Sequence, residues 1–104
     1  MKTETVSVVR IYVRERENLL EKVVRFLHDE SEAAGVTVLR GIEGFSGAGE
    51  PHAAYLLDLS LDLPLVIEFY DAPERVAEII HSLLRRFPLH HIVSWTASSY
   101  RPRA

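Results

Sequence analysis

The sequence contains no cysteine, which excludes disulfide bonds, thiolate nucleophiles, iron–sulfur clusters and zinc sites built from cysteine. It also lacks an excess of basic residues, because 12 lysines and arginines stand against 15 aspartates and glutamates. The net charge of −3 gives no overall basic field that would attract nucleic acid. No apolar run approaches the roughly 20 residues of a membrane span, and no apolar stretch follows Lys2 as in a signal peptide. We therefore expect a cytoplasmic protein that neither inserts into membranes nor binds nucleic acid.

The chain also lacks any repeat, low-complexity tract or linker that would divide its 104 residues. That length is typical of one domain, and 47% of the residues are hydrophobic. A chain of this size buries roughly 65% of the surface that its unfolded form exposes, enough for one core. We therefore expect a single domain over residues 1–104.

Four segments have the composition and alternation of β-strands. Apolar and polar residues alternate over 6–13 and 92–100, whereas 36–39 and 65–70 are continuous apolar or β-branched runs. Strict alternation also occurs over 57–63, and its pairing cannot be decided from the sequence.

Helical spacing of apolar residues predicts two helices. We expect Asn18 to be the N-cap of the first helix and Gly35 to end it in a left-handed conformation. The second helix begins at Pro73, within the capping-box-like segment 71–74, and Pro88 ends it. The predicted apolar faces are Leu20, Val23, Val24 and Leu27 in the first helix, and Val76, Ile79, Ile80, Leu83, Leu84 and Phe87 in the second.

The resulting order β-α-β-β-α-β predicts an α+β, ferredoxin-like fold: a four-stranded antiparallel sheet with two helices on one face. The other face of such a sheet is uncovered and carries Val8 and Tyr12. We therefore expect the chain to associate with further copies through that face.

The sequence lacks the motifs that known activities of this fold class require. The fold by itself does not indicate a function, because it supports many different ones. RNA recognition needs stacking aromatics in a basic motif, which is absent. Acylphosphatase-type hydrolysis needs a glycine-rich cradle, and residues 14–18 contain no glycine. Ser46, Ser60 and Ser82 lie outside any nucleophile-elbow context. The sequence thus indicates a protein that is not an enzyme.

Four of the five glycines lie within residues 40–51, so we expect this segment to be the mobile loop of the protein. Consecutive backbone N–H groups there can surround an anion, and Arg40 would supply charge. No Gly-Lys-Ser/Thr follows, which excludes a Walker loop. Phe45 equally suits recognition of a partner, and a plain hairpin connection also explains the segment.

Five histidines raise the alternative of a metal- or ion-responsive module. His90 and His91 are adjacent at a strand start and point to opposite faces. A site would therefore have to gather His52 with His90 or His91 across a subunit boundary. Solvated histidines without a ligand are the simpler interpretation.

The residues that follow the first helix closely resemble those of a bacterial and archaeal family of uncharacterised PII-like proteins, related to nitrogen-regulatory PII signalling proteins. The likeness extends from residue 6 to about residue 100. The segments that carry it are Gly-Val-Thr-Val-Leu-Arg-Gly-Ile-Glu-Gly-Phe at 35–45, His52, Leu-Asp-Leu-Ser at 57–60, Asp-Leu-Pro-Leu-Val-Ile-Glu at 62–68, and Asp71.

This resemblance implies a ferredoxin-like homotrimer whose sheets face inward. In PII proteins the long loop after the second strand reaches out to target proteins, and its base binds ATP or ADP between subunits. The matching loop here is residues 41–54. Family members are often encoded near fluoride-exporter-type membrane proteins, which implies a membrane transporter or channel as target. The expected function is a regulatory protein that senses a small effector, with an adenine nucleotide as the candidate and no certain cofactor.

A bound phosphate would then lie at the base of the loop, with basic residues of a neighbouring subunit beside it. The alternative is that Arg40 only pairs with a carboxylate such as Glu43 or Glu68. PII proteins have a glycine-rich loop with a phosphate-binding lysine after the second helix, whereas residues 85–91 here contain neither glycine nor lysine. The candidate ligand-binding residues are Arg40, Gly41, Glu43, Gly44 and Phe45 at the loop, and Arg85, Arg86, Arg101 and Arg103 from a neighbouring subunit.

Overall fold

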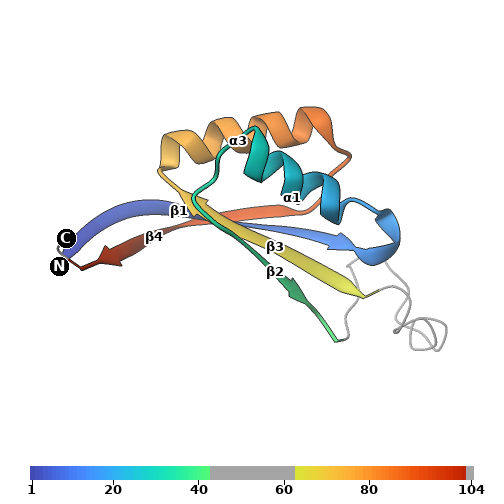
Figure 1. The fold of residues 1–104 in the computed structure, drawn as a ribbon, viewed down its shortest axis with the longest axis horizontal. Helices are drawn as coiled ribbons and strands as arrows, with labels where there is room; N and C mark the ends of the chain where they lie inside the picture. Colours follow the sequence, from blue (N-terminus) through green and yellow to red (C-terminus); the bar gives the residue numbers. More distant parts are fainter. Residues whose placement is uncertain (43–62, 103–104) are drawn as a thin grey trace.

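The computed structural model describes residues 1–42 and 63–102. Both helices lie on one face of a four-stranded antiparallel sheet (Figure 1). The predicted α+β, ferredoxin-like fold is therefore confirmed. The elements in chain order are strand β1 (Lys2–Arg14), the 3-10 turn η1 (Glu15–Glu17), helix α1 (Leu20–Asp29), strands β2 (Val36–Arg40) and β3 (Pro64–Asp71), helix α3 (Pro73–Arg86) and strand β4 (Ile92–Arg101).

The strands lie in the order β2-β3-β1-β4, with β3 and β1 in the centre. β1 pairs with β3 over residues 7–14 and with β4 over residues 2–11. The first residues of β1 therefore pair with β4 alone, as a two-stranded extension that carries both termini away from the helices (Figure 1). Of the alternating segment 57–63, only Leu63 lies within the described residues.

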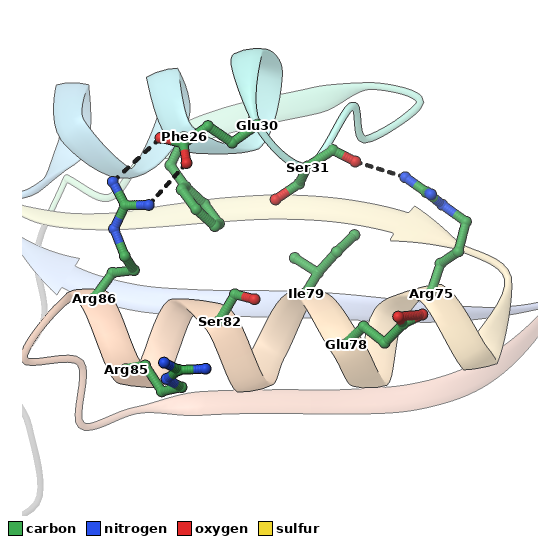
Figure 2. Close-up of a pocket in the computed structure, with 9 residues that line it drawn as sticks. All are labelled: Phe26, Glu30, Ser31, Arg75, Glu78, Ile79, Ser82, Arg85 and Arg86. Atoms are coloured by element: carbon green, nitrogen blue, oxygen red, sulfur yellow. Dashed lines mark hydrogen bonds and ion pairs between the residues drawn. The ribbon is translucent and has the colours of Figure 1, made fainter.

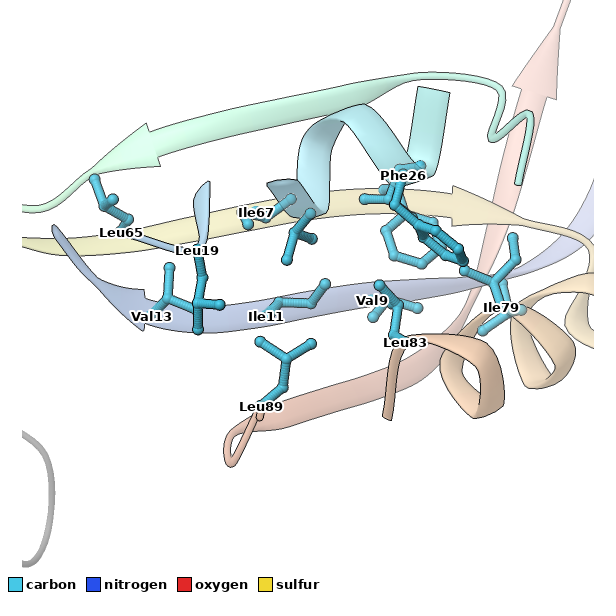
Figure 3. Packing of buried hydrophobic residues seen from close by; sticks show 14 residues of the cluster. Val9, Ile11, Val13, Leu19, Phe26, Leu65, Ile67, Ile79, Leu83 and Leu89 are labelled. Atoms are coloured by element: carbon cyan, nitrogen blue, oxygen red, sulfur yellow. The ribbon is translucent and has the colours of Figure 1, made fainter. Parts of the chain in front are cut away.

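The core fills the space between the sheet and the helices (Figure 3). Val9, Ile11 and Val13 alternate along β1 and are buried, as the period of two predicts. Burial of each such side chain contributes roughly 1.5–3 kcal/mol to folding, which makes this layer the main source of stability. The other buried members of the cluster are Leu19, Val23, Phe26, Leu27, Leu65, Ile67, Phe69, Val76, Ile79, Leu83 and Leu89.

The predicted apolar helix faces are confirmed at all positions except one. Leu83 is 0% exposed in α3, whereas Leu84 is 54% exposed and does not join the core. Leu84 is 100° further round the helix than Leu83, so it points away from the sheet. Phe87 does pack inward, edge-on to Phe26, with 5.8 Å between the ring centroids.

The expected start of the first helix is wrong. A 3-10 turn separates β1 from α1, and Asn18 ends that turn in a left-handed conformation with φ 56°. The N-cap of α1 is Leu19. The turn is held by Glu17, whose carboxylate accepts a hydrogen bond from the Arg14 backbone N–H at 2.6 Å.

The expected end of the first helix is also wrong, because α1 ends at Asp29 rather than near Gly35. The left-handed residue of the connection is Glu32, with φ 52°. Arg75 of α3 donates hydrogen bonds to the carbonyls of Ser31 at 2.6 Å and Glu32 at 3.4 Å. The helix itself is closed by local backbone bonds, since the N–H groups of Ser31 and Ala33 donate to the carbonyls of Phe26 and Leu27 at 3.1 Å. Arg75 then fixes the connection that follows the helix.

The ends of the second helix agree with the prediction. Pro73 occupies the first turn of α3 and Ala72 is the N-cap. α3 ends at Arg86, and Phe87 is extended, as expected of a residue that precedes a proline.

Leu83 and Leu84 provide a matched test of the core, because they are adjacent and chemically identical. Leu83→Ala should lower the free energy of unfolding by about 3 kcal/mol, since it removes a fully buried side chain and leaves a cavity. Leu84→Ala should lower it by less than about 1 kcal/mol. Urea denaturation at equal protein concentration measures both, and equal losses would contradict this assignment of the α3 faces.

Candidate functional site

Three strand ends meet at one end of the sheet, at the base of segment 43–62 (Figure 1). The Gly41 N–H donates to the Pro64 carbonyl at 2.7 Å, which joins the exit of β2 to the start of β3. The Glu15 N–H donates to the Leu63 carbonyl at 3.0 Å, which ties the η1 turn to the same place. The candidate anion-binding residues Arg40 and Gly41 therefore lie at a hydrogen-bonded junction of β1, β2 and β3.

Arg40 forms an ion pair with Glu15 across this junction. Arg40 Nη2 lies 3.3 Å from Glu15 Oε1, and the two side chains are 60% and 28% exposed. The guanidinium is thus largely accessible to a ligand, while the carboxylate beside it is mostly covered.

The alternative that Arg40 pairs with Glu68 is wrong. Arg40 lies opposite Leu65 in the sheet, and Leu65 is buried beneath the helices. Glu68 is three residues further along β3 and therefore points to the other face. The other alternative partner, Glu43, lies outside the described residues.

Gly41 has a packing role that its sequence context does not reveal. A Cβ atom on Gly41 would lie 2.7 Å from Pro64 Cγ and 3.3 Å from the Pro64 carbonyl oxygen. Its φ is not positive, so the position requires close approach to Pro64 rather than a special conformation. Gly44 and Phe45, the further candidates on this segment, lie outside the described residues.

Arg85 and Arg86 line a groove of about 490 Å³ between α1 and α3 (Figure 2). The Arg86 guanidinium donates to both carboxylate oxygens of Glu30, at 2.8 and 3.2 Å, and lies 5.0 Å from the centroid of the Phe26 ring. The hydrogen bonds to Glu30 raise the pKa of Arg86 above its ordinary value. Within one chain, Arg86 therefore links the two helices.

Arg101 lies at the opposite end of the sheet from Arg40. It is opposite Lys2 in the ladder and forms an ion pair with Glu4. Arg40 lies level with residue 13 of β1, so about 36 Å of strand separates the two arginines. Arg103 lies outside the described residues. Within one chain, then, Arg40, Arg86 and Arg101 are not brought together, and each pairs with a different carboxylate.

The face of the sheet opposite the helices is open and apolar, as the sequence predicts. Apolar side chains from all four strands are between 41% and 48% exposed on it. Single exposed apolar side chains are ordinary, but a set of neighbouring aromatic and aliphatic residues is typical of an interaction surface. We call this the open face; its large exposed residues are Tyr12, Leu39, Tyr70, Val93 and Trp95.

An ion pair crosses the centre of the open face. Arg10 of β1 donates from Nε to Glu68 of β3 at 2.7 Å, and its guanidinium lies 5.8 Å from the ring centroid of Trp95 on β4. The hydrogen bond to Glu68, and to a smaller extent that to Tyr12, raises the pKa of Arg10 above its ordinary value. The centre of the open face therefore holds a charge pair among exposed apolar side chains.

The described residues do not support the histidine alternative. Within 1–42 and 63–102, no three histidine, aspartate or glutamate side chains are grouped so that they could hold a metal ion. His90 and His91 are both exposed, and His52 lies outside these ranges. None of the helices in the described part of the chain is both long enough and apolar enough to cross a membrane.

Residues 6–98 match the family model described as "Uncharacterized ACR, COG1993" (DUF190). The chain belongs to this family. A UPF0166 protein from Aquifex aeolicus (strain VF5) is 33% identical over 72 residues, which cover 69% of this chain and 73% of that relative. The resemblance to an uncharacterised family is thereby confirmed.

Solved PII-like proteins share the fold of this DUF190 chain at low sequence identity. CPII from Thiomonas intermedia K12, bound to ADP and bicarbonate, has a TM-score of 0.62 and 18% identity over 94% of this chain and 89% of its own. A PII-like signalling protein from Thermus thermophilus has a TM-score of 0.61 and 16% identity over 95% of this chain and 91% of its own. The DUF190 chain therefore has a PII-like fold.

Sequence reasoning missed Glu15 and the Arg10–Glu68 pair. Alternation along β1 gave a usable signal for Arg10, which stands between Val9 and Ile11 and so faces away from the core. Glu15 gave no signal, because its position depends on the η1 turn and on the distant strand β2.

Gly41 and Gly35 provide a matched test of the junction. Gly41→Ala should lower the free energy of unfolding by about 1–3 kcal/mol, because its methyl group would collide with Pro64. A Cβ on Gly35 would meet nothing within 4 Å, so Gly35→Ala should be neutral or stabilising by up to about 1 kcal/mol. Thermal and urea unfolding of both variants measure the difference, and a tolerated Gly41→Ala would contradict the close approach.

Proposed function

We propose that this DUF190 chain is a non-enzymatic, PII-like regulatory protein that works in the cytoplasm as a homotrimer. A small effector, an adenine nucleotide, binds at the junction around Arg40 and Gly41. The effector controls segment 41–54, and this segment acts on a partner protein. The observation that carries the proposal is an accessible guanidinium at the base of that segment in a PII-like fold.

The open face supports assembly. Five large apolar residues on it face solvent in the single chain, and covering them with other copies would stabilise both fold and trimer. The charges at the centre of the face, Arg10 and Glu68, have opposite sign and pair with each other, so they do not by themselves repel an identical copy. The resemblance to PII proteins implies the same arrangement, with the sheets facing inward.

Two lines of support favour an adenine nucleotide as the effector. Structures of CPII contain ADP with bicarbonate, and ADP with AMP and acetate. Arginine suits such a ligand because its planar guanidinium offers paired donors to phosphate oxygens. Arg85, Arg86, Arg101 and Arg103 are the proposed basic contributors from a neighbouring subunit; within one chain Arg86 and Arg101 pair with carboxylates away from Arg40.

Regulation requires the nucleotide to bind two states of segment 41–54 with different affinity. Glu43, Gly44 and Phe45 belong to this segment and remain predicted contacts. Its position after the second strand corresponds to the target-binding loop of PII proteins. The proposed partner is a membrane transporter or channel, which one state of the segment would bind and the other would release.

Assembly can be tested on the open face with a matched control on α3. Tyr70→Glu places a charge on the open face and should convert a trimer into monomers, because an unpaired carboxylate cannot be buried there. Leu84→Glu makes a similar change at a comparably exposed position on the helical side and should leave the trimer intact. Light scattering coupled to size-exclusion chromatography distinguishes them, and a wild-type monomer at micromolar concentration would refute assembly.

Nucleotide binding can be tested at Arg40 by titration calorimetry with ADP. Arg40→Ala should weaken binding about tenfold to a hundredfold, because a charged hydrogen bond to phosphate is lost. Arg25→Ala removes the same charge from an exposed position on α1 and should bind ADP like the wild type. No binding by the wild type at millimolar ADP, or equal affinity of the two variants, would refute the site.

A further inference from the structure

Glu15 occupies the place that an anionic ligand of Arg40 would need. Its Oε1 atom lies 3.3 Å from Arg40 Nη2. A charge-assisted hydrogen bond between such groups usually measures roughly 2.7–2.9 Å. The observed pair is longer, and Glu15 Oε1 is buried without a hydrogen-bond partner among the described residues. The two charges are thus close, but no N–H of Arg40 is aimed at that oxygen.

A pair of this kind is easier to separate than an aligned salt bridge. Arg40 gains Coulomb attraction from Glu15 but not the directional part of the interaction. A phosphate oxygen that presents its lone pairs to the guanidinium can make the aligned bonds that Glu15 does not. A phosphate that approaches while Glu15 stays in place meets a locally neutral pair instead of a free cation.

The Arg40–Glu15 pair also lies beside the described residues that flank segment 43–62 on both sides. Arg40 precedes Gly41, whose backbone N–H forms a hydrogen bond with the Pro64 carbonyl at the start of β3. The backbone N–H of Glu15 forms a hydrogen bond with the carbonyl of Leu63, which immediately precedes β3. Separation of Arg40 from Glu15 would therefore loosen a contact between η1 and the end of β2 while the backbone bonds of the junction remain.

We infer that Glu15 is an internal competitor for the anionic effector: its carboxylate occupies Arg40 in the free protein, and the effector's phosphate displaces it. This inference rests on the proposed nucleotide site and adds the residue that sets its affinity. The same exchange links ligand binding to the contact between η1 and β2, beside both ends of the segment that would act on a partner.

Calorimetry with ADP tests the competition. Glu15→Gln keeps the shape of the side chain and removes its charge, so it should bind ADP about two- to fivefold more tightly than the wild type. Glu21→Gln makes the same change in net charge at an exposed position in the first turn of α1 and should leave the affinity unchanged. Glu15→Asp keeps the charge but draws it back by one methylene, and its affinity should lie between those of wild type and Glu15→Gln.

A double-variant cycle separates competition from simple repulsion of the ligand. If Glu15 acts by occupying Arg40, Glu15→Gln should give no gain in affinity when Arg40 is already alanine. If Glu15 only repels phosphate through space, the gain would persist in that background and the inference would be wrong. Circular dichroism and thermal melting of each variant check that the fold is retained; if Glu15→Gln does not fold, Glu15→Asp decides the sign of the effect.

The remaining outcomes distinguish this inference from the proposed function. ADP binding that depends on Arg40 but not on Glu15 would refute the competition and leave the nucleotide site standing. Weaker binding by Glu15→Gln would also refute it, because Glu15 would then be orienting Arg40 for the ligand. Absence of binding in wild type and Glu15→Gln alike would overturn both the competition and the site.

Discussion

Packing of both helices against the same face of the sheet is the constraint on which the other features of this protein depend. Val9 and Ile11 on β1, with Ile67 and Phe69 on β3, are buried in the centre of that face beneath α1 and α3. Within residues 1–42 and 63–102 no third layer covers the opposite face, so the apolar residues there are exposed in the single chain. One-sided burial therefore produces at once a stable domain and a surface that favours association.

The open face and the candidate anion site are neighbours through strand alternation. Leu39 belongs to the open face, and the next residue, Arg40, lies on the other side of β2 beside Glu15. A subunit that covers Leu39 would contact the strand that ends at Arg40. Assembly and effector binding would thus act on the same short strand, at the edge of the described sheet beside β3.

Three of the arginines considered as anion ligands are paired within their own chain. Arg40, Arg86 and Arg101 pair with Glu15, Glu30 and Glu4 respectively. This agrees with the acidic balance of the sequence, in which carboxylates outnumber the lysines and arginines. An anionic effector therefore has to compete with internal carboxylates, and a poorly aligned pair such as Arg40–Glu15 is one that a ligand would separate readily.

The sequence by itself determined the fold class and the faces of most elements. These follow from local periods of two and 3.6 residues, and the burial of β1 and α3 obeys those periods apart from Val6, which is buried although it is in phase with the open face, and Leu84. The family to which the chain belongs could also be recognised from the sequence, by the segment that includes Arg40 and Gly41. Only the structure showed where the first helix ends: Glu32 takes the left-handed conformation expected of Gly35, and Arg75 from α3 binds the carbonyls of this connection.

Tertiary structure also decided the partners of the charged residues. The sequence suggested Glu68 as a partner of Arg40. In the structure the register of the sheet places Glu68 on the open face, where it pairs with Arg10. Glu15 reaches Arg40 because a 3-10 turn brings it beside a strand 25 positions away in the chain. Periodicity fixes the face on which a side chain lies, whereas its contact across the sheet depends on register, turns and distant elements that no local pattern encodes.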